Sequence, residues 1–510
     1  MFHPSVPVSA SRAAAMPCVT LDDWVRWQVE GYTCLPFACW LSEAKVPRQW
    51  RDLLDSPTAV LLESGHGDGF TYFCRRPARV VVGDETSASI TSSATIEVPE
   101  QRTGSPLEIA TAFASERRAP AILGWPAITT GVLALFGYDL VQTWEKISRR
   151  AARDLALPLY VLVEPAELFV YDHDERRLGV VVWRDVAADS VGAQFVAARL
   201  AADAAIDAWL RASDPESSHV ADSAAPVNAP SPAPVLSFSR ESFCEAVRRV
   251  QAYIADGHTY QVNLSLRESR ATHSPPEAIY EALRAINPSP YMGFVRTPQF
   301  SLVCGSPELL VRVKDNVVSS RPIAGTRPRG SLPEDDASLS AELFASPKER
   351  AEHLMLVDLI RNDIGRVASH GSVVVREFMA LEKYSHVMHI VSQVEGRLAP
   401  DVGTAEIVRS MFPGGTITGC PKVRTMEIIE ELEPVGRGFY TGALGWITAN
   451  GELELNIIIR SMLVKDGVAH VQAGAGIVAD SVPERELDES LRKAKALWVA
   501  LERASAAPSS

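Results

Sequence analysis

The strand and helix patterns of the sequence are compatible with an α+β fold, on two observations. Segments in which apolar and polar residues alternate, the pattern of a half-buried strand, occur at 258–269, 300–319 and 454–472, with helix-like segments between them. Two further alternating apolar runs flank the turn sequence DHDERR within 157–183, which predicts a β-hairpin. A chain that mixes such strands with helices is compatible with an α+β protein.

The chain is expected to divide into two units joined by a linker. Residues 1–18 lack the apolar core of a signal peptide and are predicted to form a ragged extension. Residues 19–212 form the first unit and 237–503 the second, followed by a tail at 504–510. Between the units, 213–236 is rich in Ser, Ala and Pro and lacks periodicity, which predicts a flexible linker.

Composition and charge describe an ordinary soluble globular protein. Of 510 residues, 46% are hydrophobic and 22% are charged, and the net charge of −13 argues against nucleic-acid binding, which needs a basic face. No apolar run has the length that a membrane span needs. The seven cysteines show no CxxC or Cys/His ligand spacing, so neither a zinc site nor a disulfide framework is expected, and a reducing cytoplasm is the predicted location.

Four segments of the first unit carry clear patterns. TAVLLESG (58–65) predicts a strand that ends in a turn, and a second strand is expected around FTYFCRR (70–76). The segment 131–147 is Gly-rich and then helical in pattern. The segment 195–212 predicts a strong helix.

The second unit opens with a predicted helix and strand. Ser239 and Ser242 are N-cap candidates before apolar residues at helical spacing, and TYQVNLSLRES (259–269) then alternates with period two. Further on, the Gly-rich loop FPGGTITGC is followed by Pro421, which is expected to open a helix whose free N–H groups suit an anion. Such loops also occur without any ligand.

Two pairs of glutamates stand out in the second unit. Glu349 and Glu352 form one pair and Glu486 and Glu489 the other, each at i,i+3 spacing on a predicted helix, so that each helix presents two carboxylates on one face. A solvated acidic face is the alternative interpretation of either pair alone. Carboxylate oxygens are also the ligands that Mg²⁺ prefers.

Eight motifs of the second unit follow one another in an informative order. They are CGSPELL (304–310), RPIAGTRPRG (321–330), KERAEHLMLVDLIRNDIGRV (348–367), EKYSHVMHIVS (382–392), FYTGALGW (439–446), ELNIIIRSM (454–462), QAGAGIVADS (472–481) and ERELDESLRKAKAL (484–497). This series resembles the chorismate-utilising enzymes, meaning the large subunits of anthranilate synthase and 4-amino-4-deoxychorismate synthase. The resemblance runs from about Ser237 to about Leu501 and is weaker before Arg211. It implies an α+β fold of two antiparallel sheets packed as a sandwich and wrapped by helices, with the site in the cleft between the halves.

The resemblance implies a magnesium site on the two glutamate pairs. Mg²⁺ would bridge the two helices and the ring carboxylate of chorismate. Glu352 and Glu489 are expected to be direct ligands, and Glu349 and Glu486 to act directly or through water.

The resemblance also assigns residues to the substrate. The enolpyruvyl carboxylate of chorismate would be held by Arg460, by Tyr440 and by the backbone amides of Gly474 and Gly476. A buried arginine needs an anionic partner, and a carboxylate is its best one, although a salt bridge within the protein would satisfy it equally. Lys493 matches a lysine that approaches the ring carboxylate.

Loss of the C4 hydroxyl requires a proton donor, and Glu308 matches the general acid/base of the family. His389 also matches a residue of the family's site, although a lone histidine is more often part of a core. Thr416 and Thr326 are expected to donate hydrogen bonds to the substrate. Gln261 stands where relatives that add water carry a basic lysine, and an amide cannot activate water, so ammonia is the implied nucleophile.

Ammonia needs a source, and the chain shows no glutaminase signature of a GxCxG elbow with a downstream HxE. The expected partner is therefore a separate glutamine amidotransferase subunit. The product is expected to be 4-amino-4-deoxychorismate, the precursor of para-aminobenzoate and folate, because the longest motif matches are to that branch. Anthranilate is the alternative, since Ala324 replaces a lysine that some aminodeoxychorismate synthases use covalently.

A tryptophan pocket is a further expectation, because anthranilate synthases hold regulatory tryptophan with similar segments. Its residues would be Leu62, Glu63, Ser64, Asn287, Pro288, Tyr291 and Met292. The same segments have a purely structural interpretation. A catalytically inactive homologue is the alternative to an enzyme as a whole, and the joint presence of the residues assigned above argues against it.

Overall fold

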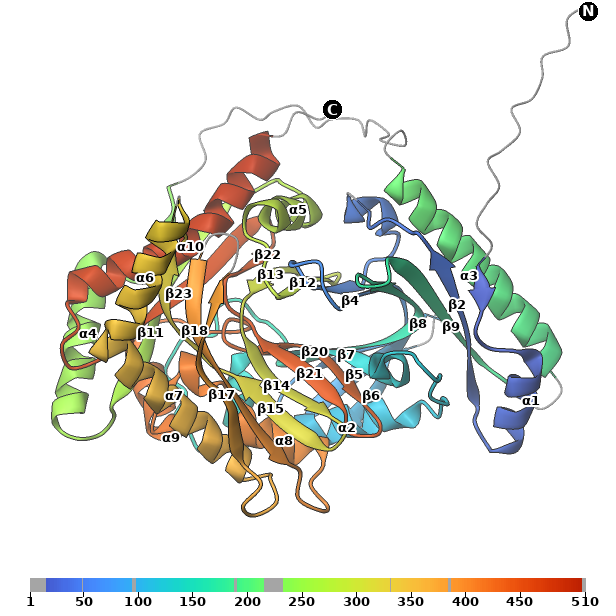
Figure 1. The fold of residues 1–510 in the computed structure, drawn as a ribbon, viewed down its shortest axis with the longest axis horizontal. Helices are drawn as coiled ribbons and strands as arrows, with labels where there is room; N and C mark the ends of the chain where they lie inside the picture. Colours follow the sequence, from blue (N-terminus) through green and yellow to red (C-terminus); the bar gives the residue numbers. More distant parts are fainter. Residues whose placement is uncertain are drawn as a thin grey trace, which may run out of the picture.

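The computed structural model describes residues 15–47, 49–93, 98–187, 190–214, 233–330, 332–383 and 387–506. Within these ranges antiparallel strands form the centre of the molecule, and helices surround them (Figure 1). No helix in these ranges has the length and apolar character needed to cross a membrane.

The strands form two layers. The first layer contains, in spatial order, β10 (Val235–Leu236), β11 (Gln261–Ala271), β23 (Val468–Ile477), β22 (Ser461–Lys465), β13 (Ser301–Ser306), β12 (Tyr291–Arg296), β3 (Ala59–Glu63), β4 (Phe70–Gly83), β8 (Tyr160–Asp172), β9 (Arg177–Asp185), β2 (Cys34–Ser42) and β1 (Met16–Pro17), with β19 (Gly419–Cys420) beside the start of β11. The second contains β6 (Glu100–Thr103), β5 (Ser87–Ser92), β4, β8, β7 (Gly131–Phe136), β20 (Ala443–Thr448), β21 (Leu453–Ile457), β14 (Leu309–Lys314), β15 (Val317–Arg321), β18 (Val387–Arg397) and β17 (Val374–Lys383), with β16 (Ile323–Pro328) also on β18.

The long strands β4 and β8 belong to both layers. Their outer ends pair with each other in the first layer, and after an irregular stretch between Phe73 and Arg79 they pair again in the second. All strands of the described ranges are therefore linked into one hydrogen-bonded network. The predicted α+β fold with two antiparallel sheets is confirmed, with the addition that the sheets share these two strands.

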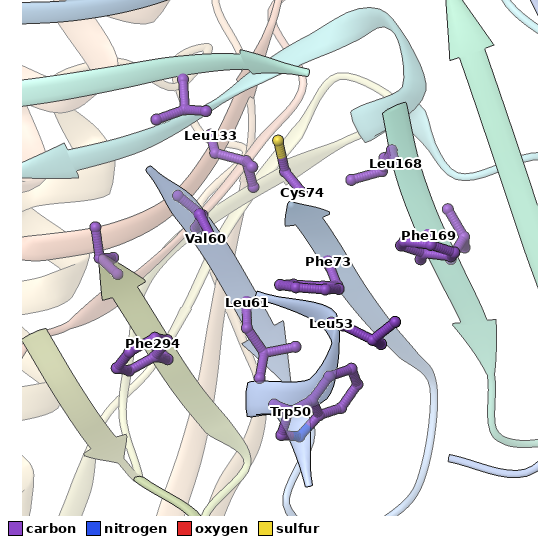
Figure 2. Close-up of a cluster of buried hydrophobic side chains, with 14 of the residues drawn as sticks. Trp50, Leu53, Val60, Leu61, Phe73, Cys74, Leu133, Leu168, Phe169 and Phe294 are labelled. Atoms are coloured by element: carbon purple, nitrogen blue, oxygen red, sulfur yellow. The ribbon is translucent and has the colours of Figure 1, made fainter. Parts of the chain in front are cut away.

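Side chains from both layers meet in one core. Val60 and Phe294 from the first layer belong to the same buried cluster as Leu133 from the second. Figure 2 shows these residues with Trp50 and Phe73, whose ring centroids lie 5.4 Å apart. The mutual burial of apolar side chains holds the two layers face to face.

The helices contact the layers in groups. Helices α1 (Leu21–Val29) and α3 (Val191–Ser213) lie against β2, and α4 (Arg240–Ala255) and α9 (Lys422–Leu432) lie against β11. Helix α5 (Pro276–Ile286) lies against β13, and α10 (Pro483–Ala506) lies against β23. Helices α6 (Pro333–Ala345) and α7 (Pro347–Gly365) lie against β16 and β18, and α8 (Thr404–Met411) lies against α7 and α2 (Pro106–Glu116). Short 3₁₀ helices are η1 (Trp50–Leu53), η2 (Ala127–Thr130), η3 (Tyr138–Thr143) and η4 (Gly415–Ile417). The two helices predicted to bind magnesium, α7 and α10, thus lie on different strands of the second unit.

Most local predictions hold. The hairpin within 157–183 is β8 and β9, and Ser239 caps α4 by accepting a 3.1 Å hydrogen bond from the Ser242 N–H. The helical pattern at 131–147 is wrong in part. That segment forms β7, fully buried between β8 and β20, and then only the short helix η3.

The two predicted units are interleaved. Strand β3 of the first unit pairs with β12 of the second, and β7 pairs with β20. Parts of the predicted extension and linker also form strands, because β1 pairs with β2 and β10 pairs with β11. Residues 1–14, 215–232 and 507–510 lie outside the described ranges. The division at the linker stays a prediction about the sequence.

Candidate active site

Glu308 is a buried carboxyl group in the turn between β13 and β14. Its backbone is fixed on both sides, because its N–H donates to Ser306 Oγ at 3.2 Å and its carbonyl accepts from the Ile457 N–H at 3.0 Å. Burial raises the pKa of the Glu308 carboxyl to about 7, against the opposing influence of the Thr416 hydroxyl and the Arg460 guanidinium. A carboxyl with such a pKa can give or accept a proton near neutral pH.

Arg460 lies between β21 and β22 with its guanidinium largely buried. Its backbone has a φ of 49°, which is uncommon for a residue with a side chain, and its carbonyl accepts from the Gly305 N–H at 3.0 Å. Burial lowers the pKa of Arg460, and the Glu308 carboxyl acts in the opposite direction. Within the described ranges its guanidinium has no hydrogen bond and no ion pair within 4.0 Å. A buried cation in this state favours an anionic ligand.

His389 on β18 lies close enough to Arg460 for the guanidinium to influence its pKa. Its Nδ1 is 3.1 Å from the carbonyl oxygen of Gly325, so Nδ1 carries the proton that it donates and the neutral ring keeps a lone pair on Nε2. Burial lowers the pKa of His389, and the Arg460 guanidinium lowers it further while the Gly325 carbonyl raises it. The imidazole is therefore neutral at neutral pH.

Gly325 brings the predicted metal helix close to His389. It occupies a bulge of β16 at φ 65°, and a Cβ atom there would lie 2.8 Å from Leu343 Cδ1 and 3.0 Å from Glu349 Oε2. Ala324, on the same strand, is buried opposite Ile390 of β18. Thr326 is paired with His389 in the ladder, and its side chain lies outside what the structure describes.

The glutamate pairs lie on α7 and α10 as predicted. Glu352 Oε1 is 3.4 Å from the amide Nε2 of Gln261, which donates to it, and Glu349 pairs with Arg327 at 3.4 Å. On α10, Glu489 forms a half-exposed ion pair with Lys493 at 3.0 Å.

Lys493 also donates to the Gly474 carbonyl at 3.0 Å, which ties α10 to β23. Glu486 lies in the first turn of α10, and its carbonyl accepts from the Ser490 hydroxyl at 2.9 Å. Glu352 is thus linked to β11 through Gln261, and Glu489 to β23 through Lys493.

The carboxylate donors of these helices fit Mg²⁺ by type. In the part of the chain that the structure describes, however, no three His, Cys, Asp or Glu side chains lie close enough together to hold a metal ion. A magnesium ion at α7 and α10 would need additional oxygen ligands from the substrate or from water. The magnesium assignment therefore stays a prediction.

Strands β11 and β23 form a polar floor for the site. Gln261 and Asn263 extend across β23, where a Cβ atom on Gly476 would lie 2.2 Å from Gln261 Nε2 and one on Gly474 would lie 2.6 Å from Asn263 Oδ1. The glycines are therefore required for these side chains to fit.

Two amide oxygens of β11, Gln261 Oε1 and Asn263 Oδ1, and the Thr416 hydroxyl oxygen of η4 are buried without a hydrogen-bond partner among the described residues. Such groups are costly unless a ligand or water satisfies them. Asn263 was missed by the sequence reasoning. The period-two alternation of β11 places it on the same face as Gln261 and could have indicated it.

The Gly-rich loop differs from its prediction. Pro421 is the N-cap residue of α9 instead of its first helical residue. The glycines allow close packing, since a Cβ atom on Gly415 would lie 2.0 Å from Leu359 and one on Gly414 would lie 2.7 Å from Ile457. The contribution of the loop to the site is the Thr416 hydroxyl, beside Glu308.

The segments predicted to hold tryptophan line one cavity of about 300 Å³. Leu62, Glu63 and Ser64 line it from one side and Tyr291 and Met292 from another, whereas Asn287 and Pro288 are not among its lining residues. The Glu63 carboxylate already accepts from Tyr280 Oη at 2.9 Å and Arg284 Nε at 3.0 Å, and the Ser64 hydroxyl donates to Asp68. The structure confirms that these segments meet, and tryptophan binding stays a prediction.

Comparison with known proteins defines the family. The chorismate binding enzyme family matches this chain over residues 59–498, and the chain belongs to that family. It is 42% identical to aminodeoxychorismate synthase component 1 of Bacillus subtilis over 87% of this chain and 91% of that protein, and 38% identical to anthranilate synthase component 1 of Pseudomonas putida over 94% and 98%. The crystal structure of anthranilate synthase component I from Streptococcus pneumoniae superposes with a TM-score of 0.71 at 30% identity, covering 84% of this chain and 92% of that one.

Proposed function

We propose that this protein aminates chorismate with ammonia to give 4-amino-4-deoxychorismate. The observation that supports chorismate chemistry most directly is the buried Arg460 guanidinium, which has no ion pair among the described residues and lies beside a carboxyl group whose pKa is raised to about 7. The observation that favours this product is the 42% identity to an aminodeoxychorismate synthase component 1 across nearly the whole of both chains.

The proposed roles of the residues in this chain are as follows. Arg460, the Tyr440 hydroxyl and the amides of Gly474 and Gly476 bind the enolpyruvyl carboxylate, and Lys493 approaches the ring carboxylate. Protonated Glu308 donates its proton to the departing C4 hydroxyl, because a pKa of about 7 leaves a large protonated fraction at neutral pH.

Neutral His389, fixed through Nδ1 to the Gly325 carbonyl, contributes its Nε2 to the reacting ring as a polar contact. Gln261 supplies an amide in place of a base, so that ammonia and not water attacks. Thr416 donates a hydrogen bond from the loop beside Glu308, and Thr326 is expected to do the same from β16.

Glu352 and Glu489 would hold Mg²⁺ directly, with Glu349 and Glu486 directly or through water. When bound, the ion supplies positive charge at the ring carboxylate and draws electron density from the conjugated ring. The relatives named component 1 indicate a second component, and we propose that it is a glutamine amidotransferase subunit that supplies the ammonia.

Anthranilate is the second candidate product, favoured by one residue. Ala324 on β16 has no nucleophilic side chain, so the covalent route known for a lysine at this place is closed. Several relatives of similar identity are anthranilate synthases, such as the one from Thermus thermophilus at 45% identity over 75% of this chain and 79% of that one.

Product identity is the experiment that separates the two candidates. The pure protein is incubated with chorismate, Mg²⁺ and ammonium at alkaline pH, and anthranilate is followed by its fluorescence. A parallel reaction contains an aminodeoxychorismate lyase, and para-aminobenzoate is quantified by chromatography. We expect para-aminobenzoate only when the lyase is present. Anthranilate formed without the lyase would contradict the proposed product and establish the second candidate.

A further inference from the structure

A buried ion pair lies next to several residues that are assigned to the substrate. Arg437 and Glu433, just after α9, have side chains that are 1% and 2% exposed. Two parallel hydrogen bonds join them, from Arg437 Nη2 to Glu433 Oε1 at 2.7 Å and from Nε to Oε2 at 3.0 Å. Buried charges of this kind are costly unless all their donors and acceptors are satisfied.

Arg437 uses its remaining donors on three other segments. Nη1 donates to the Ile417 carbonyl at 2.9 Å and to Thr441 Oγ1 at 3.3 Å, and Nη2 donates to the Asn263 carbonyl at 2.7 Å. With the two bonds to Glu433, all five N–H groups of the guanidinium have a partner. Thr441 has a φ of 62°, a region that a β-branched residue rarely adopts, and this bond helps to hold it there.

Glu433 and the face of the guanidinium reach further parts of the site. Glu433 Oε1 accepts from both the N–H and the Oγ of Ser265 at 2.8 Å, and Ser265 is paired with Gly474 across the β11–β23 ladder. The guanidinium carbon of Arg437 lies 4.9 Å from the ring centroid of Tyr138 and 5.6 Å from that of Tyr440. Cation–π contact thus adds to the hydrogen bonds.

Each hydrogen-bond partner of the pair outside the pair itself lies beside a residue assigned to the substrate. Ile417 follows Thr416, and Thr441 follows Tyr440. Asn263 and Ser265 lie on β11 on the same face as Gln261, where Asn263 is paired with Gly476 and Ser265 with Gly474. In the described ranges neither Arg437 nor Glu433 has a hydrogen bond or an ion pair to α7 or α10, the helices that carry the four glutamates.

We propose that Arg437 and Glu433 are positioning residues that set the geometry of the substrate-binding residues outside α7 and α10. The pair is too deeply buried to touch the substrate. It acts by fixing, through one rigid guanidinium, the loop with Thr416, the segment with Tyr440 and the strands with Gln261 and Gly474. This inference rests on the proposed function only in taking chorismate as the ligand, and it holds for either amination product.

The test is the Arg437→Lys variant. A lysine ammonium has three donors on a flexible stem and cannot replace a planar five-donor fork. We expect the Kd for chorismate, measured by calorimetry with Mg²⁺ present, to rise by about tenfold, which corresponds to the loss of about one net hydrogen bond. The KM for chorismate should rise in parallel. The half-saturating Mg²⁺ concentration should change by less than about twofold, because the pair has no hydrogen bond or ion pair to α7 or α10 in the described ranges.

The matched control is Arg75→Lys. Arg75 forms a comparable buried pair with Glu167, at 2.9 Å with side chains 6% and 7% exposed, between β4 and β8. Loss of either arginine fork should lower the melting temperature, but only Arg437→Lys should weaken chorismate binding. If Arg437→Lys lowers the melting temperature and leaves the Kd for chorismate unchanged, the pair is structural only and the inference is overturned.

A milder variant covers the case in which Arg437→Lys does not fold. Ser265→Ala removes the hydroxyl that donates a hydrogen bond to Glu433 Oε1 and leaves the ion pair intact. We expect a Kd for chorismate about threefold higher, and an unchanged Kd would overturn the inference. An unmodified protein that binds no chorismate would refute the proposed function and this inference together, whereas normal binding with insensitive variants refutes this inference alone.

Discussion

Glu308→Gln should remove catalysis while making the protein more stable at high pH. Burial raises the pKa of this carboxyl from its ordinary 4.5 to about 7. At pH 7 about half of the Glu308 side chains are protonated, compared with about 0.3% for an ordinary glutamic acid. This large acid fraction is what a proton donor to the C4 hydroxyl needs. Glutamine keeps the shape of the side chain, but its amide cannot act as a general acid near neutral pH. The kcat should therefore fall by about 10² to 10⁴.

The stability effect follows from linkage. The folded state has the higher pKa, so between pH 4.5 and pH 7 the folded protein binds more protons than the unfolded chain, and stability falls as pH rises. The shift of about 2.5 pKa units corresponds to about 3 kcal/mol of lost stability, fully present above pH 7 and absent below pH 4.5. Glu308→Gln escapes this loss, because its amide does not titrate.

The assay compares urea midpoints of the variant and the unmodified protein at several pH values, together with kcat. A matched control is Glu281→Gln, because burial also raises the pKa of Glu281 on α5 to about 7, and this residue has no assigned role in the reaction. Both variants should gain stability above pH 7, and only Glu308→Gln should lose activity. Activity within tenfold of the unmodified enzyme would refute the role as acid, and equal midpoints at pH 8 would refute the raised pKa.

Three further predictions concern the rest of the site. Glu352→Gln and Glu489→Gln should each lower kcat more than about 100-fold at every Mg²⁺ concentration in an ammonium-dependent assay, and retained turnover would show that the metal assignment is wrong. Arg460→Met should raise the KM for chorismate roughly 10- to 100-fold without lowering the melting temperature, since no carboxylate in the described part of the chain loses a hydrogen bond or an ion pair. A lower melting temperature with an unchanged KM would contradict its role. Gln261→Lys should place an ammonium group near Glu352, whose Oε1 is now 3.4 Å from Gln261 Nε2. The product should then shift from the amine towards the water adduct, which chromatography would detect. Unaltered amination would show that Gln261 does not select ammonia.

Local patterns alone determined much of the secondary structure and indicated which residues the proposed site contains. The serine cap of α4, the hairpin of β8 and β9 and the i,i+3 glutamates on α7 and α10 depend on residues within one or two turns or strands. The residues in these interactions are close together in the sequence, so their spacing can be recognised without the structure. The motifs around Glu308, His389 and Arg460 were likewise recognisable as strings.

The tertiary structure decided what these residues do electrostatically. The raised pKa of Glu308 and the lowered pKa of His389 come from burial between strands that are remote in sequence. Residues 131–136 form a strand because β8 and β20 pair with them on both sides, and no local pattern contains those neighbours. Arg437 could not be singled out in the sequence, since its partners lie at 263, 417, 433 and 441. Burial and long-range pairing set dielectric and hydrogen-bond geometry, and only the folded chain brings those partners together.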